Sequence, residues 1–154
     1  LFKRIDKTVN INYNIDCNFF IDKGDIYSLG GYGFWKSNGS LRKFNRLDNE
    51  WDIVPINKEV FNSYSWYSKT QNAVYSPFER EINAGVANQI KGIVRPFVYK
   101  LSLRDKKWEK IGRLNKLIEK SVTQDLLNGR MYNTANGILV LHNSEEMYYL
   151  DFLN

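Results

Sequence analysis

The chain has 154 residues, of which 43% are hydrophobic and 25% are charged, with a formal net charge of +5. It is long and apolar enough to bury the core of one domain, which excludes a disordered segment. Its Lys and Arg residues are scattered, which predicts a solvated basic surface and no nucleic-acid partner. The aromatic share of 15% favours β-structure, because flat, stiff side chains pack well on a pleated sheet.

The sequence offers few side chains for cofactor chemistry. Cys17 is the only Cys and His142 the only His, which excludes an internal disulfide and a Cys/His zinc site. We interpret Cys17 as a buried structural thiol. The carboxylates are not grouped as an acid–base pair would be, so we expect no catalytic residue, metal or cofactor. No apolar run approaches the roughly 18 residues of a membrane helix, so we expect no membrane span.

The chain begins with residues 1–12, which we interpret as the end of an outer β-strand followed by a connector. The segment Ile5-Asp-Lys-Thr-Val9 resembles Ile56-Asn-Lys-Glu-Val60, which follows the first complete hairpin. Because the two segments match, residues 1–12 are expected to lead into a repeat unit as residues 56–60 do. The abrupt start at Leu1 is typical of a processed or excised chain.

Residues 13–56 form the first predicted unit, with four strands joined by polar turns. Polar, Asp-containing turns between apolar runs are typical of antiparallel hairpins. The elements follow in the order strand Asn18–Ile21, turn Asp22–Asp25, strand Ile26–Gly31 and hairpin Leu41–Pro55, whose second strand opens with Trp51. The unit is therefore predicted to be a four-stranded antiparallel sheet.

Residues 57–115 repeat this unit, and residues 116–154 repeat it without its last strand. The segment Val98–Gly112 aligns without a gap with Leu41–Pro55, at an offset of 57 positions that brings Trp108 onto Trp51. The two Trp residues are therefore expected at equivalent, largely buried positions. In the third unit, Ile138 is aligned with Val74 and Leu150 with Leu101.

The repeat resembles that of kelch β-propellers, whose units are about 50 residues long and four-stranded. The first unit carries the motif most fully: the pair Gly30-Gly31 ends its second strand, Phe44 takes the aromatic position, and Trp51 follows seven positions later. The second and third units lack the glycine pair. The resemblance implies an all-β fold of about three kelch-like blades. Since typical propellers have four to eight blades, we expect an arc of a larger, bacterial propeller. The alternative is a three-blade ring, closed by the N-terminal strand.

The candidate site residues lie in the connections between the second and third strands, because kelch-like propellers often bind partners through these loops and those after the fourth strand. The first connection is Tyr32–Gly39, and the second is a long loop from Phe78 to Arg95. Exposed aromatic and Arg side chains are common anchors of interfaces, although Phe34 and Trp35 could equally pack under the blade edge. The candidate binding residues are Tyr32, Phe34, Trp35, Lys36, Arg80, Asn88 and Arg95.

These features favour a non-catalytic scaffold that binds a protein partner or the remaining blades of a propeller. Two alternatives stay open. One is an extracytoplasmic sensor or carbohydrate-binding segment, suggested by the aromatic and amide-rich loops. The other is part of a propeller enzyme whose catalytic residues lie outside this chain. In each case an isolated arc is expected to expose an apolar blade face that invites association.

Overall fold

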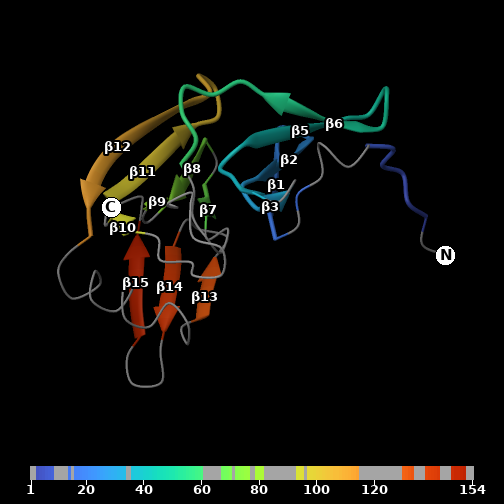
Figure 1. The fold of residues 1–154 in the computed structure, drawn as a ribbon. Coiled ribbons are helices and arrows are strands. Elements are labelled where there is room, and N and C mark those ends of the chain that lie inside the picture. The colour runs from blue at the N-terminus through green and yellow to red at the C-terminus, as the bar shows by residue number, and fades with distance from the viewer. Residues whose placement is uncertain are drawn as a thin grey trace.

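The computed structural model describes residues 3–8, 14, 16–33, 36–60, 67–70, 72–76, 79–81, 93–95, 97–114, 130–133, 138–142 and 147–151. This part of the chain is all-β, with fifteen strands and no helix. The prediction of an all-β fold with four-stranded antiparallel sheets is confirmed for the first two units (Figure 1).

The first sheet is an antiparallel meander built from the first unit. Its order is β1 (Asn18–Asp22), β2 (Asp25–Leu29), β5 (Leu41–Asn45) and β6 (Glu50–Val54). A small hairpin of β3 (Tyr32–Gly33) and β4 (Lys36–Ser37) lies between β2 and β5.

The second sheet repeats this order. Its strands are β7 (Ser68–Lys69), β8 (Ala73–Ser76), β11 (Phe97–Ser102) and β12 (Lys107–Arg113). A hairpin of β9 (Glu79–Glu81) and β10 (Ile93–Arg95) lies between β8 and β11. The prediction of a loop over residues 78–95 was wrong at both ends, where the backbone groups pair as strands.

The third sheet has three strands: β13 (Arg130–Asn133), β14 (Ile138–His142) and β15 (Met147–Asp151). In Figure 1 the first strands β1, β7 and β13 lie towards the middle of the view. The last strands β6, β12 and β15 lie towards its outside. In this view, each of the three sheets therefore has its first strand on the inner side.

The strand register confirms the repeat for the first two units. Tyr27 lies opposite Lys43 in the first sheet, and Tyr75 opposite Lys100 in the second. Phe44 likewise lies opposite Trp51, and Leu101 opposite Trp108. The two Trp residues are thus equivalent, as predicted. Trp108 is buried as expected, but Trp51 is only half-buried.

The third unit needs a correction of one residue. The alignment of Ile138 with Val74 predicts that Ile138 lies opposite Leu150, whereas Leu139 does so and Ile138 faces Asp151. Val74 lies opposite Leu101, so with Leu150 aligned with Leu101 the place of Val74 is taken by Leu139. The run Ile-Leu-Val-Leu is apolar throughout, so it has no alternation from which its register could be predicted.

The turns at one end of the sheets are tight. Lys23 and Gly24 both have positive φ, 48° and 84°, as the two central residues of a type I′ hairpin turn do. Asn49 and Lys106 end equivalent turns and have φ of 59° and 55°. Residues 38–40 form no turn, although an Asn-Gly pair is typical of one. Gly39 instead passes close to the backbone of Val60, whose carbonyl oxygen a Cβ would approach to 2.7 Å.

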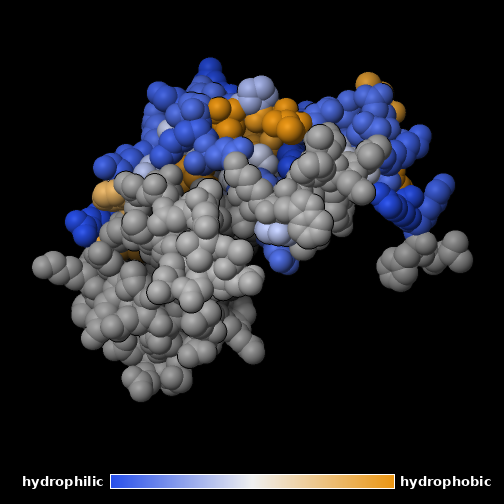
Figure 2. Space-filling model, in the orientation of Figure 1, coloured by the Kyte–Doolittle hydropathy of each residue, from blue (hydrophilic) through white to orange (hydrophobic). Residues whose placement is uncertain are grey.

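The core lies between the first two sheets, which pack face to face. We call the face of each sheet that points toward the preceding unit its leading face, and the opposite face its trailing face. One buried cluster joins the trailing face of the first sheet to the leading face of the second: Phe20, Tyr27, Leu29, Leu41, Tyr67, Val74, Tyr99, Leu101 and Trp108. Val54 and Ile56 pack against it as the chain passes from one sheet to the other. Figure 2 shows hydrophobic residues gathered at the upper edge between the two sheets.

Candidate binding surface

The two small hairpins occupy equivalent places, each at the end of its sheet opposite the tight turns. The β3–β4 hairpin follows β2, and the β9–β10 hairpin follows β8, the equivalent strand of the second sheet. Each hairpin extends the connection between the second and third strands beyond the sheet. The candidate residues predicted from the sequence lie in these two connections.

The structure describes some of these residues only in part. Tyr32 begins β3 and is exposed, and Lys36 begins β4. Arg80 lies opposite Val94, and Arg95 lies opposite Glu79, so the two Arg residues share one hairpin. The other candidates, Phe34, Trp35 and Asn88, lie outside the described residues.

An amide network holds the base of the first hairpin. Asn14 donates from Nδ2 to the carbonyl oxygen of Gly30 at 2.8 Å and to Oδ1 of Asn38 at 3.0 Å. Asn38 Oδ1 also accepts from the backbone N–H of Ser40 at 3.1 Å, and Gly30 N–H donates to Ser40 O at 3.0 Å. This network was not predicted from the sequence. The only signal for it is the presence of Asn residues on both sides of the glycine pair.

Gly30 allows the second sheet to approach the first. Gly30 and Gly31 have φ of 71° and 102°, in the region that favours glycine. A Cβ on Gly30 would lie 2.9 Å from the hydroxyl oxygen of Tyr67. Tyr67 is fully buried, and its hydroxyl donates to the carbonyl oxygen of Val60 at 2.9 Å. The glycine pair therefore serves a close contact between two units as well as the backbone turn.

The connectors that lead into the first two units bind the outer strands of those units. Asn57 accepts from the N–H of Trp108 at 2.7 Å and donates to its carbonyl oxygen at 3.0 Å. In the first unit, Thr8 Oγ1 accepts from the N–H of Trp51 at 2.7 Å, and Lys7 N–H donates to Asn49 O at 2.7 Å. Residues 3–8 thus form hydrogen bonds to β6 and the turn before it, as Asn57 does to β12.

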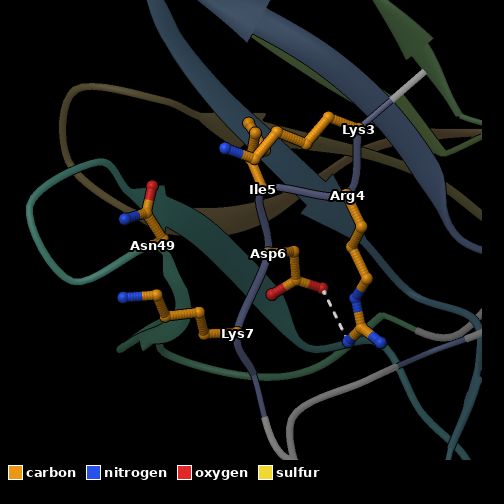
Figure 3. Close-up of a pocket in the computed structure, with 6 residues that line it drawn as sticks. All are labelled: Lys3, Arg4, Ile5, Asp6, Lys7 and Asn49. Atoms are coloured by element: carbon orange, nitrogen blue, oxygen red, sulfur yellow. Dashed lines mark ion pairs between the residues drawn. The ribbon is translucent and has the colours of Figure 1, made fainter. Parts of the chain in front are cut away.

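A pocket of about 580 Å³ lies beside the N-terminal segment. Figure 3 shows its lining residues, which are Lys3, Arg4, Ile5, Asp6, Lys7 and Asn49. Arg4 and Asp6 form an ion pair at 3.8 Å, with Arg4 largely exposed. A second pocket of about 560 Å³ lies at the tight turns and is lined by charges of both signs, including Asp22, Arg104 and Glu109. Neither pocket is lined by a candidate residue that the structure describes.

Charged groups join the two sheets at their tight turns. Lys69 and Asp22 form a largely buried ion pair at 3.5 Å. The Lys106 ammonium lies 4.9 Å from the ring centre of Tyr27, across the interface. Burial lowers the pKa of Lys106, while Asp22 and Asp25 act in the opposite direction. Burial is also the main cause that raises the pKa of Tyr27.

Arg42 and Cys17 are partly withdrawn from water on the first sheet. Burial lowers the pKa of Arg42, although the charges of Cys17 and Glu59 favour its protonated form. Burial raises the pKa of the Cys17 thiol, which is half-buried and donates to the carbonyl oxygen of Asn14 at 3.4 Å. Cys17 is therefore less buried than predicted, and its raised pKa disfavours the reactive thiolate.

The described part of the chain contains no group of three or more His, Cys, Asp or Glu residues able to hold a metal ion. Within the same residues, no helix is long and apolar enough to cross a membrane. In comparisons with known proteins, no family model matches the chain, and no curated protein matches it.

Proposed function

We propose that this chain is an arc of a kelch-like β-propeller that acts as a non-catalytic protein-binding scaffold. The partner is proposed to bind at the β3–β4 and β9–β10 hairpins. The observation that carries the proposal is the difference between the two ends of the sheets. Two- and four-residue turns close one end, whereas residues 30–40 and 77–96 extend from the other. Extended connections on a rigid sheet scaffold commonly bind partners.

Three features of the fold support the propeller. The first two sheets share one strand order and one register, and they pack with the trailing face of one on the leading face of the next. The connectors into the first two units bind the outer strands of the units that they enter. The first strand of each sheet lies inwards in Figure 1. A blade cannot bury both of its faces alone, so such sheets are stable when stacked around an axis.

The binding proposal is tested by replacing the hairpins. In one variant, Tyr32–Ser37 and Glu79–Arg95 are each replaced by a short Asn-Gly turn. In the matched control, Arg46–Asn49 at the opposite end is replaced by a different turn of the same length. Each immobilised chain is exposed to an extract of the cells that produce it. We expect a protein that the unaltered chain and the control retain, and that the hairpin variant loses.

Two results would contradict the proposal. One is a retained protein that binds equally to the hairpin variant, because the hairpins would then not form the binding surface. The other is material that survives protease digestion of the extract and proves to be a polysaccharide. Circular dichroism of the hairpin variant shows whether its sheets are intact.

A further inference from the structure

The interface between the first two sheets shows what each face of a unit requires. The leading face of the second sheet carries Tyr67, Val74, Tyr99, Leu101 and Trp108, all of them buried. They are buried because the trailing face of the first sheet, with Leu29 and Leu41 at its centre, packs on them. One interface therefore joins two different faces, one from each unit.

On the leading face of the first sheet, Arg42 and Phe44 at the centre are buried, but the residues of the two outer strands are not covered in the same way. Ile21 lies opposite Ile26, and Lys69 lies opposite Val74, so Ile21 and Lys69 are equivalent. Phe19 and Tyr67 each lie two residues before them and are therefore equivalent as well. Tyr67 is 1% exposed, whereas Phe19 is 61% exposed. Phe19 and Phe44 instead contact the Trp51 ring, at centroid distances of 5.7 and 5.3 Å.

Exposed apolar side chains continue across this face. Ile21 and Ile53 are 66% and 60% exposed. We call Phe19, Ile21, Trp51 and Ile53 the leading patch. A contiguous patch of this kind on a soluble protein commonly marks an interaction site.

The third sheet exposes the opposite face. Met147 and Tyr149 of β15 are each 74% exposed. The sequence alignment of Leu150 with Leu101 gives Met147 and Tyr149 the places of Val98 and Lys100, which belong to the trailing face. Met147 is the counterpart of Leu41, which is fully buried in the first sheet because the second sheet covers it. In this chain the first and third sheets thus expose residues at positions that the interface between the first two sheets buries.

We propose that the leading patch of one copy binds the trailing face of the third sheet of a second copy, and the reverse. This inference rests on the propeller proposed above. Head-to-tail contacts between unlike faces close into a ring when the rotation allows it. Two copies with three sheets each would supply six blades, within the usual range of four to eight. The assembly would bury both exposed faces with the type of packing seen between the first two sheets.

The first test is the mass of the 154-residue chain by light scattering coupled to size exclusion. We expect twice the 18.1 kDa of one chain at about 100 μM, and dissociation on dilution. Ile53→Asp and Met147→Asp are each expected to weaken the dimer by about tenfold or more. Leu47→Asp is the control, because Leu47 is exposed on a turn outside both faces. Circular dichroism and thermal melts establish that all three variants fold.

A mixing experiment distinguishes unlike faces from like faces. The Ile53→Asp chain keeps an intact trailing face, and the Met147→Asp chain keeps an intact leading patch. Their mixture is therefore expected to form a heterodimer through one unaltered interface, although neither chain dimerises well alone. A chain that stays monomeric at about 100 μM, an assembly larger than two copies, or a mixture without heterodimer would overturn the proposal.

The hairpin variant separates this inference from the binding function. It is expected to lose the captured protein while it remains a dimer, because its leading patch and its third sheet are unaltered. A dimer that fails while partner binding persists would overturn the head-to-tail assembly alone.

Discussion

The leading faces of the first and second sheets present equivalent residues in two different surroundings. Trp108 and Tyr67 are buried and lie 6.2 Å apart between ring centres. Their counterparts Trp51 and Phe19 also contact each other, yet Phe19 is mostly exposed. The difference lies in what covers the face and not in the sheet. Phe44 and Leu101 at the centre are buried in both sheets, so the neighbouring unit decides burial at the outer positions of the face.

The largest expected effect is at the two Trp residues. Trp108→Ala should lower the free energy of unfolding by about 3–5 kcal/mol, since it empties a packed position between two sheets. Trp51→Ala should cost only about 1–2 kcal/mol, because the indole is only partly buried. The measurement is urea denaturation of both variants at a concentration where the chain is monomeric. Equal losses at the two positions would contradict the comparison.

Protein concentration sharpens this prediction. If a second copy covers the leading patch, the cost of Trp51→Ala should grow as the concentration rises, whereas the cost of Trp108→Ala should stay constant. Ile53→Asp, combined with Trp51→Ala, provides the control, because it should remove that dependence.

The second prediction concerns the glycine at the contact between the sheets. Gly30→Ala forces a Cβ to within 2.9 Å of the Tyr67 hydroxyl oxygen, at a φ of 71°. Gly24→Ala has a similar φ of 84°, but its Cβ meets nothing within 4 Å. Gly24→Ala should cost about 1–2 kcal/mol from backbone strain alone. Gly30→Ala should cost about 1–3 kcal/mol more, as overpacking does. Thermal melts that rank the two variants in the opposite order would refute the role of Gly30.

The sequence predicts the sheets better than it predicts their surroundings. The pattern of Trp51 and Trp108 after polar turns was sufficient to predict two equivalent hairpins, because local turn chemistry and apolar runs determine them. It failed at Ile138–His142, where every residue before the His is apolar and both registers bury the same kind of side chain. It also failed at Glu79–Glu81, a charged segment without the residues favoured in strands.

The long-range contacts could not be predicted from the sequence for a different reason. Nothing in Phe19 and Tyr67 themselves reveals that one is exposed and the other buried, because their exposure depends on the neighbouring sheet. The bond of Asn57 to Trp108 joins residues 51 positions apart, and no local pattern indicates it. Tyr32 and Lys36 were predicted in a connection between two strands, and the structure places them in the β3–β4 hairpin. The repeat motif carries no information about the partner that these residues bind.

The third prediction compares the two connectors. Asn57→Ala removes both a donor and an acceptor from the backbone of Trp108 and should cost about 1–2 kcal/mol. Thr8→Ala removes one acceptor from the N–H of Trp51 and should cost about 0.5–1 kcal/mol. Hydrogen exchange at the amides of Trp108 and Trp51 measures each effect at its own site. Unchanged exchange of the Trp108 amide in Asn57→Ala would show that the connector does not protect β12.

The smallest expected effect is a pH dependence at Lys106, which lies at the interface between the first two sheets. Burial between the sheets lowers its pKa in the folded chain, so the charged form costs stability that the unfolded chain does not bear. This cost is present in full below the folded pKa and disappears as the pH rises from the folded value to the ordinary value of Lys. The Lys106→Met chain has no such titration, and its backbone has the same positive φ to adopt. The stability of the unaltered chain relative to Lys106→Met should therefore rise with pH as the pH approaches the ordinary pKa of Lys, about 10.4.

The raised pKa of Tyr27 acts oppositely on stability, because the Tyr of the unfolded chain ionises first. That contribution is common to both chains while the ring stays buried. Urea denaturation of the two chains at a series of pH values between about 8 and 10 measures the difference directly. A difference that is flat or falls with pH would mean that the Lys106 ammonium is hydrated and does not lie against Tyr27. Asn49, the equivalent residue of the first sheet, has no ionisable side chain, so Asn49→Met should change stability by an amount that is the same at every pH in this range.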